Sequence, residues 1–187
     1  MRKLSEILPE SSAFFLGNGM PIRDADRFLF PKRCRGFFGN RGLSGIDGNI
    51  ATAAGIADGI EASVIAFLGD QTCLHDLNSL PLLKKTTHPV IVIASNNFGS
   101  GIFSHLPIAN WPQFETYMAA AHSWRFEEAA KMFDISYLPF ENISFEKPAL
   151  IELFTNRKDN YQFQKEFLET CQTRLKLDQN EIQTGCT

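Results

Sequence analysis

The sequence lacks an excess of basic residues and lacks any long hydrophobic run. Its 187 residues include 18 Lys and Arg against 21 Asp and Glu, which gives a formal net charge of −3. A protein that binds nucleic acid through its phosphates needs a basic surface, so nucleic acid is not an expected partner. The longest apolar stretches, such as Pro89–Ser95, are far shorter than the roughly 20 residues that cross a bilayer, so no membrane span is expected.

Signals for metal clusters, redox chemistry, export and nucleotide binding are also missing. The N-terminal segment MRKLSEILPE contains no apolar core of a signal peptide, which makes a cytoplasmic location the expectation. No G-x-G-x-x-G follows the first predicted strand and no Walker lysine is present, so the defining residues of dinucleotide and nucleoside-triphosphate sites are absent. No C-x-x-C pair or zinc-type spacing occurs, which favours reduced, unrelated thiols at Cys34, Cys73, Cys171 and Cys186.

The composition that remains is that of an ordinary globular domain. Apolar residues make up 44% of the chain, aromatic residues 12% and charged residues 21%. No repeat, low-complexity stretch or Pro/Ser/Gly-rich linker divides it, so a single domain over residues 1–178 is predicted. The last residues, 179–187, have almost no apolar content and are predicted to be a frayed tail.

Apolar runs alternate with segments of helical periodicity. The predicted strands are 13–16, 36–38, 63–68, 89–94 and 149–154, and the predicted helices are 48–60, 73–85, 111–121, 126–133 and 160–177. Strands that are apolar on both faces and alternate with helices are typical of a parallel sheet covered on both sides. The sequence therefore predicts an α/β, doubly wound fold with a mainly parallel sheet.

The ligand site of such a fold lies beyond the carboxyl ends of the strands. Two consecutive predicted strands end there in Gly69-Asp70 and in Asn96-Asn97. A carboxylate from Asp70, an amide oxygen from Asn97 and a backbone carbonyl near Gly99 form an oxygen-only set that suits Mg²⁺ completed by substrate phosphates. The amides of Gln71 and Thr72 would open a helix facing that anion.

A simpler alternative exists for each half of this predicted site. Asp70 alone would serve as the N-cap of the following helix, and the asparagine pair alone would form a turn. The joint occurrence of both motifs on consecutive strands favours a metal-bridged diphosphate site.

These residues resemble a known family. Gly69-Asp70 followed by Asn96-Asn97 is similar to the signature of thiamine-diphosphate enzymes, in which Asp and Asn hold the cation that anchors the cofactor. Three segments, Asn40–Gly48 (NRGLSGIDG), Gly69–Leu80 (GDQTCLHDLNSL) and Asn96–Pro107 (NNFGSGIFSHLP), resemble the SEPHCHC synthase (MenD) family. The similarity covers most of residues 13–138.

The resemblance implies the C-terminal, thiamine-diphosphate-binding domain of a transferase (carboligase) of menaquinone biosynthesis. Such an enzyme decarboxylates 2-oxoglutarate and adds the product to isochorismate, with thiamine diphosphate and Mg²⁺ or Mn²⁺ as cofactors. The alternatives are a domain of another thiamine-diphosphate-dependent decarboxylase or carboligase, and a non-catalytic binding module that has kept the fold.

The resemblance also implies a role for each matching residue. The divalent cation would be bound by Asp70, Asn97 and the carbonyl of Gly99. The cofactor would be contacted by Ser44, Ile46, Gly69, Gln71, Thr72, Asn97 and Ile102. The substrates would be contacted by Arg23, Arg41, Ile102, Phe103 and Leu106.

Some of these roles compete with simpler ones. Ile46 would be the bulky wedge that holds the cofactor bent, although ordinary core packing explains an isoleucine equally well. Arginine pairs with carboxylates through two parallel hydrogen bonds, which suits Arg41 in its Gly-rich loop. For Arg23, beside Asp24 and Asp26, a substrate contact and a solvated surface cation remain open.

Family members are considerably longer than this chain. In them a pyrimidine-binding domain and a central domain precede the part matched here, and the activating glutamate comes from the N-terminal domain of a partner subunit. The resemblance therefore implies that this chain contains no catalytic residue of its own and is inactive alone. It also implies a homo-oligomer in the full-length enzyme.

Overall fold

The computed structural model describes residues 1–30 and 34–184, with side chains described up to Leu175. The chain divides into two compact units, residues 1–155 and the segment that begins at Asn156. Cys34, Cys73 and Cys171 are free thiols, as predicted, and Cys186 lies outside the described residues. No helix in the described part of the chain is long and apolar enough to cross a membrane.

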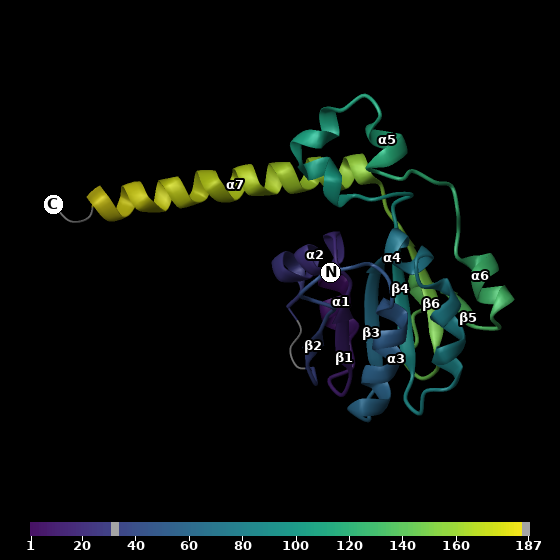
Figure 1. Cartoon of the computed structure of the whole chain (residues 1–187). Coiled ribbons are helices and arrows are strands. Elements are labelled where there is room, and N and C mark those ends of the chain that lie inside the picture. Colours follow the sequence, from purple (N-terminus) through teal and green to yellow (C-terminus); the bar gives the residue numbers. More distant parts are fainter. Residues whose placement is uncertain (31–33, 185–187) are drawn as a thin grey trace. The chain divides into compact units, whose positions relative to one another are not determined.

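The first unit is built on a six-stranded sheet in the order β2-β1-β3-β4-β6-β5 (Figure 1). All neighbouring strands pair in parallel, which confirms the predicted doubly wound α/β fold. The strands are β1 (Ala13–Leu16), β2 (Phe37–Phe38), β3 (Val64–Gly69), β4 (Val90–Asn96), β5 (Ser136–Pro139) and β6 (Ala149–Phe154). The central strands are buried on both faces, which is why they read as continuous apolar runs.

Alternating side chains of each strand pack into two separate cores. Phe15 faces the core formed with α3 (Asn49–Gly59), η1 (Leu77–Lys84) and α6 (Glu127–Met132). Phe14, its neighbour, faces the opposite core, which α1 (Arg2–Ile7) and α2 (Met20–Phe28) cover. The strand period of two thus divides the apolar residues between the two faces, and Figure 1 shows α3 lying along one face.

The order of the strands creates a switch point. From β1 the chain moves outward to β2 and then returns to β3 on the other side of β1. The helix after β1 covers one face and the helix before β3 covers the other. Ligands of open α/β sheets bind in the crevice at the carboxyl ends of the strands at such a point.

Several helices differ from the predicted ones. The helix predicted over 73–85 is a short α4 (Asp70–Leu74) followed by the 3-10 helix η1, which contains Pro81. Proline cannot sit inside an α-helix without losing a hydrogen bond and meeting the preceding turn, so the tighter helix replaces it. The helix predicted over 111–121 is reduced to α5 (Phe114–Tyr117), which follows the 3-10 turns η2 (Ile102–His105) and η3 (Pro107–Asn110).

The second unit is a single helix, α7 (Arg157–Thr184), longer than the helix predicted over 160–177. The side chain of Asn156 caps its start, because Oδ1 accepts the N–H groups of Lys158 at 2.9 Å and Asp159 at 3.3 Å. The predicted single domain over 1–178 and the frayed tail over 179–187 stay predictions. Residues 185–187 of that tail lie outside the described residues.

Candidate functional site

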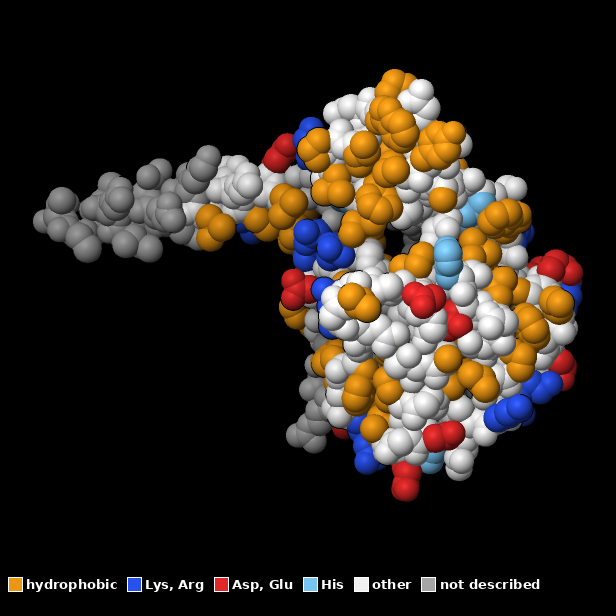
Figure 2. Space-filling model, viewed as in Figure 1, with side chains coloured by type: hydrophobic (Ala, Val, Ile, Leu, Met, Phe, Trp, Pro, Cys, Tyr) orange, Lys and Arg blue, Asp and Glu red, His pale blue; other side chains and the backbone are white. Residues whose placement is uncertain are grey.

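The loops that follow β1, β3 and β4 lie side by side because their strands are neighbours in the sheet. Gly69 at the end of β3 pairs with Ser95 of β4, so Asp70 and Asn97 leave adjacent strands within a residue of the same level. The structure therefore brings together the two side chains whose joint occurrence favoured a metal site. Beyond this edge, hydrophobic side chains gather over the segment that contains α5 (Figure 2).

Asp70 is the centre of this edge and is only 2% exposed. Its Oδ1 accepts the N–H of Gln71 at 2.7 Å, and its Oδ2 accepts those of Gly99 at 2.8 Å and Asn97 at 3.2 Å. Burial raises the pKa of Asp70 above its ordinary value of 3.8, while these N–H groups and the nearby His122 act in the opposite direction. The carboxylate joins the two loops, and it does not act as a conventional N-cap of α4.

Asn97 carries a buried oxygen without a partner. Its Oδ1 makes no hydrogen bond to any described residue. The neighbouring Asn96 is bound differently, because its Nδ2 donates to Glu152 Oε1 at 2.6 Å and to the Trp124 carbonyl at 3.0 Å. A buried polar atom without a partner is costly, so Asn97 Oδ1 is a group that a ligand would satisfy. Asn96 is thus a structural residue, whereas the side-chain oxygen of Asn97 is available to a ligand.

Gly99 and Gln71 take part in this arrangement through their N–H groups. Both donate to Asp70, and the Gln71 side-chain Nε2 donates to the Ala120 carbonyl at 3.0 Å. The predicted diphosphate donor Gln71 N–H is therefore already used by Asp70 in this structure. Gly99 has φ +151°, a conformation that favours glycine. Thr72 is buried behind the loop.

A second Gly-rich loop, residues 39–48, is fixed by Asn18. The Nδ2 of Asn18 donates to the carbonyls of Asn40 at 2.9 Å and Gly45 at 2.8 Å, and its Oδ1 accepts Arg41 Nη1 at 2.6 Å. This loop carries the predicted residues Arg41, Ser44 and Ile46. Asn18 was not predicted as a site residue, although a polar residue two positions after a buried strand was the available signal.

The end of the same loop is held by Asp76, another residue that sequence reasoning missed. Its Oδ2 accepts the N–H groups of Ile50 at 2.6 Å and Ala51 at 3.1 Å at the start of α3. Its Oδ1 accepts the hydroxyl of Ser79 at 2.6 Å. Asp76 therefore connects the segment after Asp70 to the helix that follows Ile46.

Apart from Arg41 in the loop 39–48, the predicted substrate residues lie on α2, on η2 and directly after η2. Arg23 is exposed, and its Nη1 donates to the Gly19 carbonyl at 2.6 Å. A Cβ on Gly101 would lie 3.6 Å from Met20 Cγ, so the start of η2 approaches the start of α2. Partial burial lowers the pKa of His105, and the charges of Arg27 and Arg23 lower it further. Ile102 and Phe103 are half-buried, and Leu106 is exposed.

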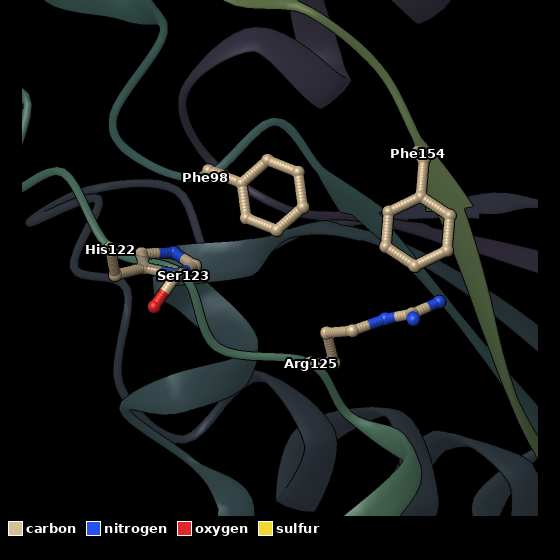
Figure 3. Close-up of a pocket in the computed structure, with 5 residues that line it drawn as sticks. All are labelled: Phe98, His122, Ser123, Arg125 and Phe154. Atoms are coloured by element: carbon tan, nitrogen blue, oxygen red, sulfur yellow. The ribbon is translucent and has the colours of Figure 1, made fainter.

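A pocket of about 530 Å³ adjoins Asp70 and contains none of the predicted residues (Figure 3). Phe98 stacks on Phe154 with ring centroids 6.0 Å apart, and the guanidinium of Arg125 lies 4.5 Å from the centroid of Phe154. His122 and Ser123 also line the pocket. His122 Nε2 lies 3.3 Å from Asp70 Oδ2, so the pocket wall contacts the predicted metal ligand.

The donor set at Asp70 suits a hard divalent cation that is completed by phosphate. It offers a carboxylate, a partnerless amide oxygen and a glycine loop. Within residues 1–30 and 34–184, no group of three or more His, Cys, Asp or Glu side chains forms a self-sufficient metal site. The roles of Asp70, Asn97 and Gly99 stay predictions.

Comparison with known proteins gives consistent matches. The family described as thiamine pyrophosphate enzyme, C-terminal TPP binding domain, matches residues 17–158. A protein of Salinibacter ruber is 44% identical over 135 residues, which cover 72% of this chain and 22% of that relative. A protein of Chlorobium phaeobacteroides is 45% identical over 143 residues, covering 73% of this chain and 24% of the relative. A protein of Bacillus velezensis is 38% identical over 191 aligned residues, which cover 95% of this chain and 33% of that relative.

All three relatives are named 2-succinyl-5-enolpyruvyl-6-hydroxy-3-cyclohexene-1-carboxylate synthase, which is SEPHCHC synthase. This chain spans between 22% and 33% of their length. The matched family segment begins directly after β1 and contains strands β2 to β6 and the Asp70 and Asn97 loops.

Proposed function

Because this chain belongs to the thiamine pyrophosphate enzyme family, as a C-terminal TPP-binding domain, we propose that it is the cofactor-binding part of a SEPHCHC synthase. The observation that carries the proposal is the buried Asp70 carboxylate beside the partnerless Asn97 Oδ1, at the end of adjacent parallel strands. The complete enzyme would decarboxylate 2-oxoglutarate and transfer the product to isochorismate, as a thiamine-diphosphate-dependent transferase.

The cation would be held by Asp70, Asn97 and the carbonyl of Gly99. Asp70 Oδ1 accepts one N–H group, from Gln71, and so keeps a lone pair for a cation. Asn97 Oδ1 would gain the partner that it lacks. Oxygen ligands of this kind suit Mg²⁺ or Mn²⁺, and diphosphate oxygens and water would complete the coordination.

The cofactor would lie between the loop of residues 39–48 and the loop after β4 that contains Gly99. When bound, thiamine diphosphate supplies the electron sink for decarboxylation of a 2-oxo acid and for formation of the new carbon–carbon bond. On this chain the contacts would come from Ser44, Ile46, Gly69, Gln71, Thr72, Asn97 and Ile102. Ile46 is half-buried at the end of the loop that Asn18 and Asp76 fix, so its position is set by hydrogen bonds at both ends.

The substrate carboxylates would be bound by Arg23 and Arg41, with Ile102, Phe103 and Leu106 as apolar lining. Arg41 is held by Asn18 through one guanidinium nitrogen, which leaves its other N–H groups available. The activating glutamate and the pyrimidine site would come from other parts of the longer protein, in a homo-oligomer. This chain alone is therefore expected to bind the cofactor without turning over substrate.

Calorimetric titration of thiamine diphosphate into this chain, with Mg²⁺ and again with EDTA, tests the proposal. Binding that requires the cation is the expected result, because Asp70 and Asn97 would contact the diphosphate only through it. Binding of equal strength with EDTA would contradict the metal assignment. Absence of binding both in this chain and in the longer protein would favour a non-catalytic module.

Preference for the substrate is tested in the longer protein. A SEPHCHC synthase is expected to consume 2-oxoglutarate and to leave pyruvate unused, because Arg23 and Arg41 would pair with two carboxylates. Consumption of pyruvate at a similar rate would favour another thiamine-diphosphate-dependent decarboxylase or carboligase.

A further inference from the structure

His122 presents a buried nitrogen to the predicted metal ligand. Its side chain is 2% exposed, and Nε2 lies 3.3 Å from Asp70 Oδ2. The contact is within ion-pair range but lacks the geometry of a hydrogen bond, so Nε2 has no hydrogen-bond partner among the described residues. A buried nitrogen with unused hydrogen-bonding capacity, so close to a site carboxylate, points to a role in that site.

The other ring nitrogen of His122 is already engaged. The backbone N–H of Trp124 donates to Nδ1 at 3.2 Å, and the indole of Trp124 stacks on the imidazole with centroids 5.2 Å apart. With Nδ1 acting as an acceptor, the proton of a neutral imidazole lies on Nε2. Nε2 therefore carries the proton, lies 3.3 Å from Asp70 Oδ2, and offers no lone pair to a metal ion.

The backbone around His122 is tied to the same two loops as Asp70. The N–H of Ser100 donates to the Ala119 carbonyl at 2.6 Å, and the N–H of His122 donates to the Phe98 carbonyl at 3.2 Å. Gln71 Nε2 donates to the Ala120 carbonyl from the other loop. The segment 119–124, which we call the strap, thus spans both sides of the predicted cation site.

The two oxygens of Asp70 are used unequally. The N–H groups of Asn97 and Gly99 both point to Oδ2, and His122 Nε2 faces this oxygen as well. Oδ1 accepts only the N–H of Gln71 among the described contacts. Donors gathered on one oxygen fix the rotation of the carboxylate and leave the other oxygen for a cation.

We propose that His122 is a positioning residue for the metal ligand Asp70: in the cation-bound site its Nε2–H, which lies 3.3 Å from Oδ2 in this structure, donates to Oδ2 so that Oδ1 is presented to the cation. The inference rests on the proposed function, because it assigns a partner to a ligand of the proposed site. Groups that bind metal-ligating carboxylates in this way change metal affinity by about 10- to 100-fold when they are removed.

The test compares three variants of this chain. In His122→Gln the amide nitrogen reaches the position of Nε2 and keeps the donor. In His122→Asn the amide is shorter and stops near the position of Nδ1, and in His122→Phe the ring remains without a donor. The exposed His75, changed to Gln, is the matched control.

The readout is the dissociation constant of Mn²⁺ at saturating thiamine diphosphate, measured by calorimetry, together with the melting temperature of the metal-free chain. We expect Asn and Phe to weaken Mn²⁺ binding by about 10- to 100-fold. His122→Gln and the control His75→Gln should bind Mn²⁺ with a dissociation constant close to that of the unaltered chain. In His122→Asn and His122→Phe the loss of Mn²⁺ affinity should not follow the change in the metal-free melting temperature.

The outcomes separate this inference from the proposed function. If the unaltered chain binds no Mn²⁺ with the cofactor, the proposed function fails and the inference fails with it. If the unaltered chain binds and all three His122 variants bind equally well, only the positioning role is overturned. A loss in Gln as large as that in Phe, or losses that follow the metal-free melting temperature, would likewise overturn it.

Discussion

Replacement of Asp76 by Ala is expected to destabilise the protein and to disturb the cofactor loop at the same time. The Asp76 side chain is nearly fully buried and satisfies the N–H groups of Ile50 and Ala51 at the start of α3, where the N-cap residue Gly48 has no side chain of its own. It also accepts the hydroxyl of Ser79. No other side chain at this helix start forms a capping hydrogen bond among the described contacts.

The size of the loss in the free energy of unfolding follows from the groups that would lose their hydrogen-bond partner in Asp76→Ala. Loss of a capping side chain costs about 0.5–2 kcal/mol. A buried N–H left without a partner costs about 1–3 kcal/mol, and Ile50 is fully buried. These two costs describe overlapping effects, so we expect a loss of about 3 kcal/mol in the free energy of unfolding for Asp76→Ala. Asp76→Asn keeps an accepting oxygen and should lose about 1 kcal/mol.

Urea denaturation measures this loss as a lower midpoint with an unchanged m-value. Asp58→Ala is the matched control, because Asp58 accepts one N–H, from Thr87, at an exposed position far from the site. A loss below about 0.5 kcal/mol in Asp76→Ala would refute the reasoning, since surface substitutions have effects of that size. So would equal losses in the Ala and Asn variants.

Three further predictions concern the site and the buried network behind it. Asp70→Ala should abolish cation-dependent binding of thiamine diphosphate in calorimetry, and undiminished binding would rule out the metal assignment. Asn18→Ala leaves the carbonyls of Asn40 and Gly45 without their donor, so urea denaturation should show a loss of about 2 kcal/mol and calorimetry a weaker cofactor affinity. Burial and the hydrogen bond to Glu152 raise the pKa of Tyr137 to about 12, so its stabilising effect should be complete below pH 10 and be lost as the pH rises through 12. Ultraviolet titration against Tyr137→Phe checks this, and phenolate formation at Tyr137 near pH 10 would contradict it.

The strands could be predicted from the sequence because each one repeats a single physical pattern. Residues 13–16 are an apolar run that is fully buried and residues 149–154 are a largely apolar run whose first four residues are buried, and the structure places β1 and β6 over the same residues. Strand β5 was missed because it is a partly exposed edge strand that ends in Pro139, so it has neither the apolar run nor a clear alternation. The helix expected over 111–121 failed because its apolar residues pack in irregular turns and not along one helical face.

The candidate site could be predicted only where local sequence and strand order act together. Asp70 and Asn97 each follow a strand, and adjacent parallel strands bring them to one edge without further information. His122 gave no such signal, because it lies in a loop with no periodicity and its partner is distant in the chain. Asp76 was hidden for the same reason, since the N–H groups that donate to it belong to the start of a helix that precedes it by many residues.

Glu152 explains why the strap can act on the metal site although most of it is irregular. This buried carboxylate forms no ion pair with the side chains that the structure describes, and its oxygens accept Asn96 Nδ2 at 2.6 Å, Tyr137 Oη at 2.7 Å and the N–H of Phe126 at 3.2 Å. Phe126 lies two residues after the strap, and Asn96 directly precedes Asn97. The strap is thus anchored to β6 at its end and to the Ser100 N–H at its start. A loop held at both ends by buried hydrogen bonds presents His122 in one position, which is the condition that a positioning residue must meet.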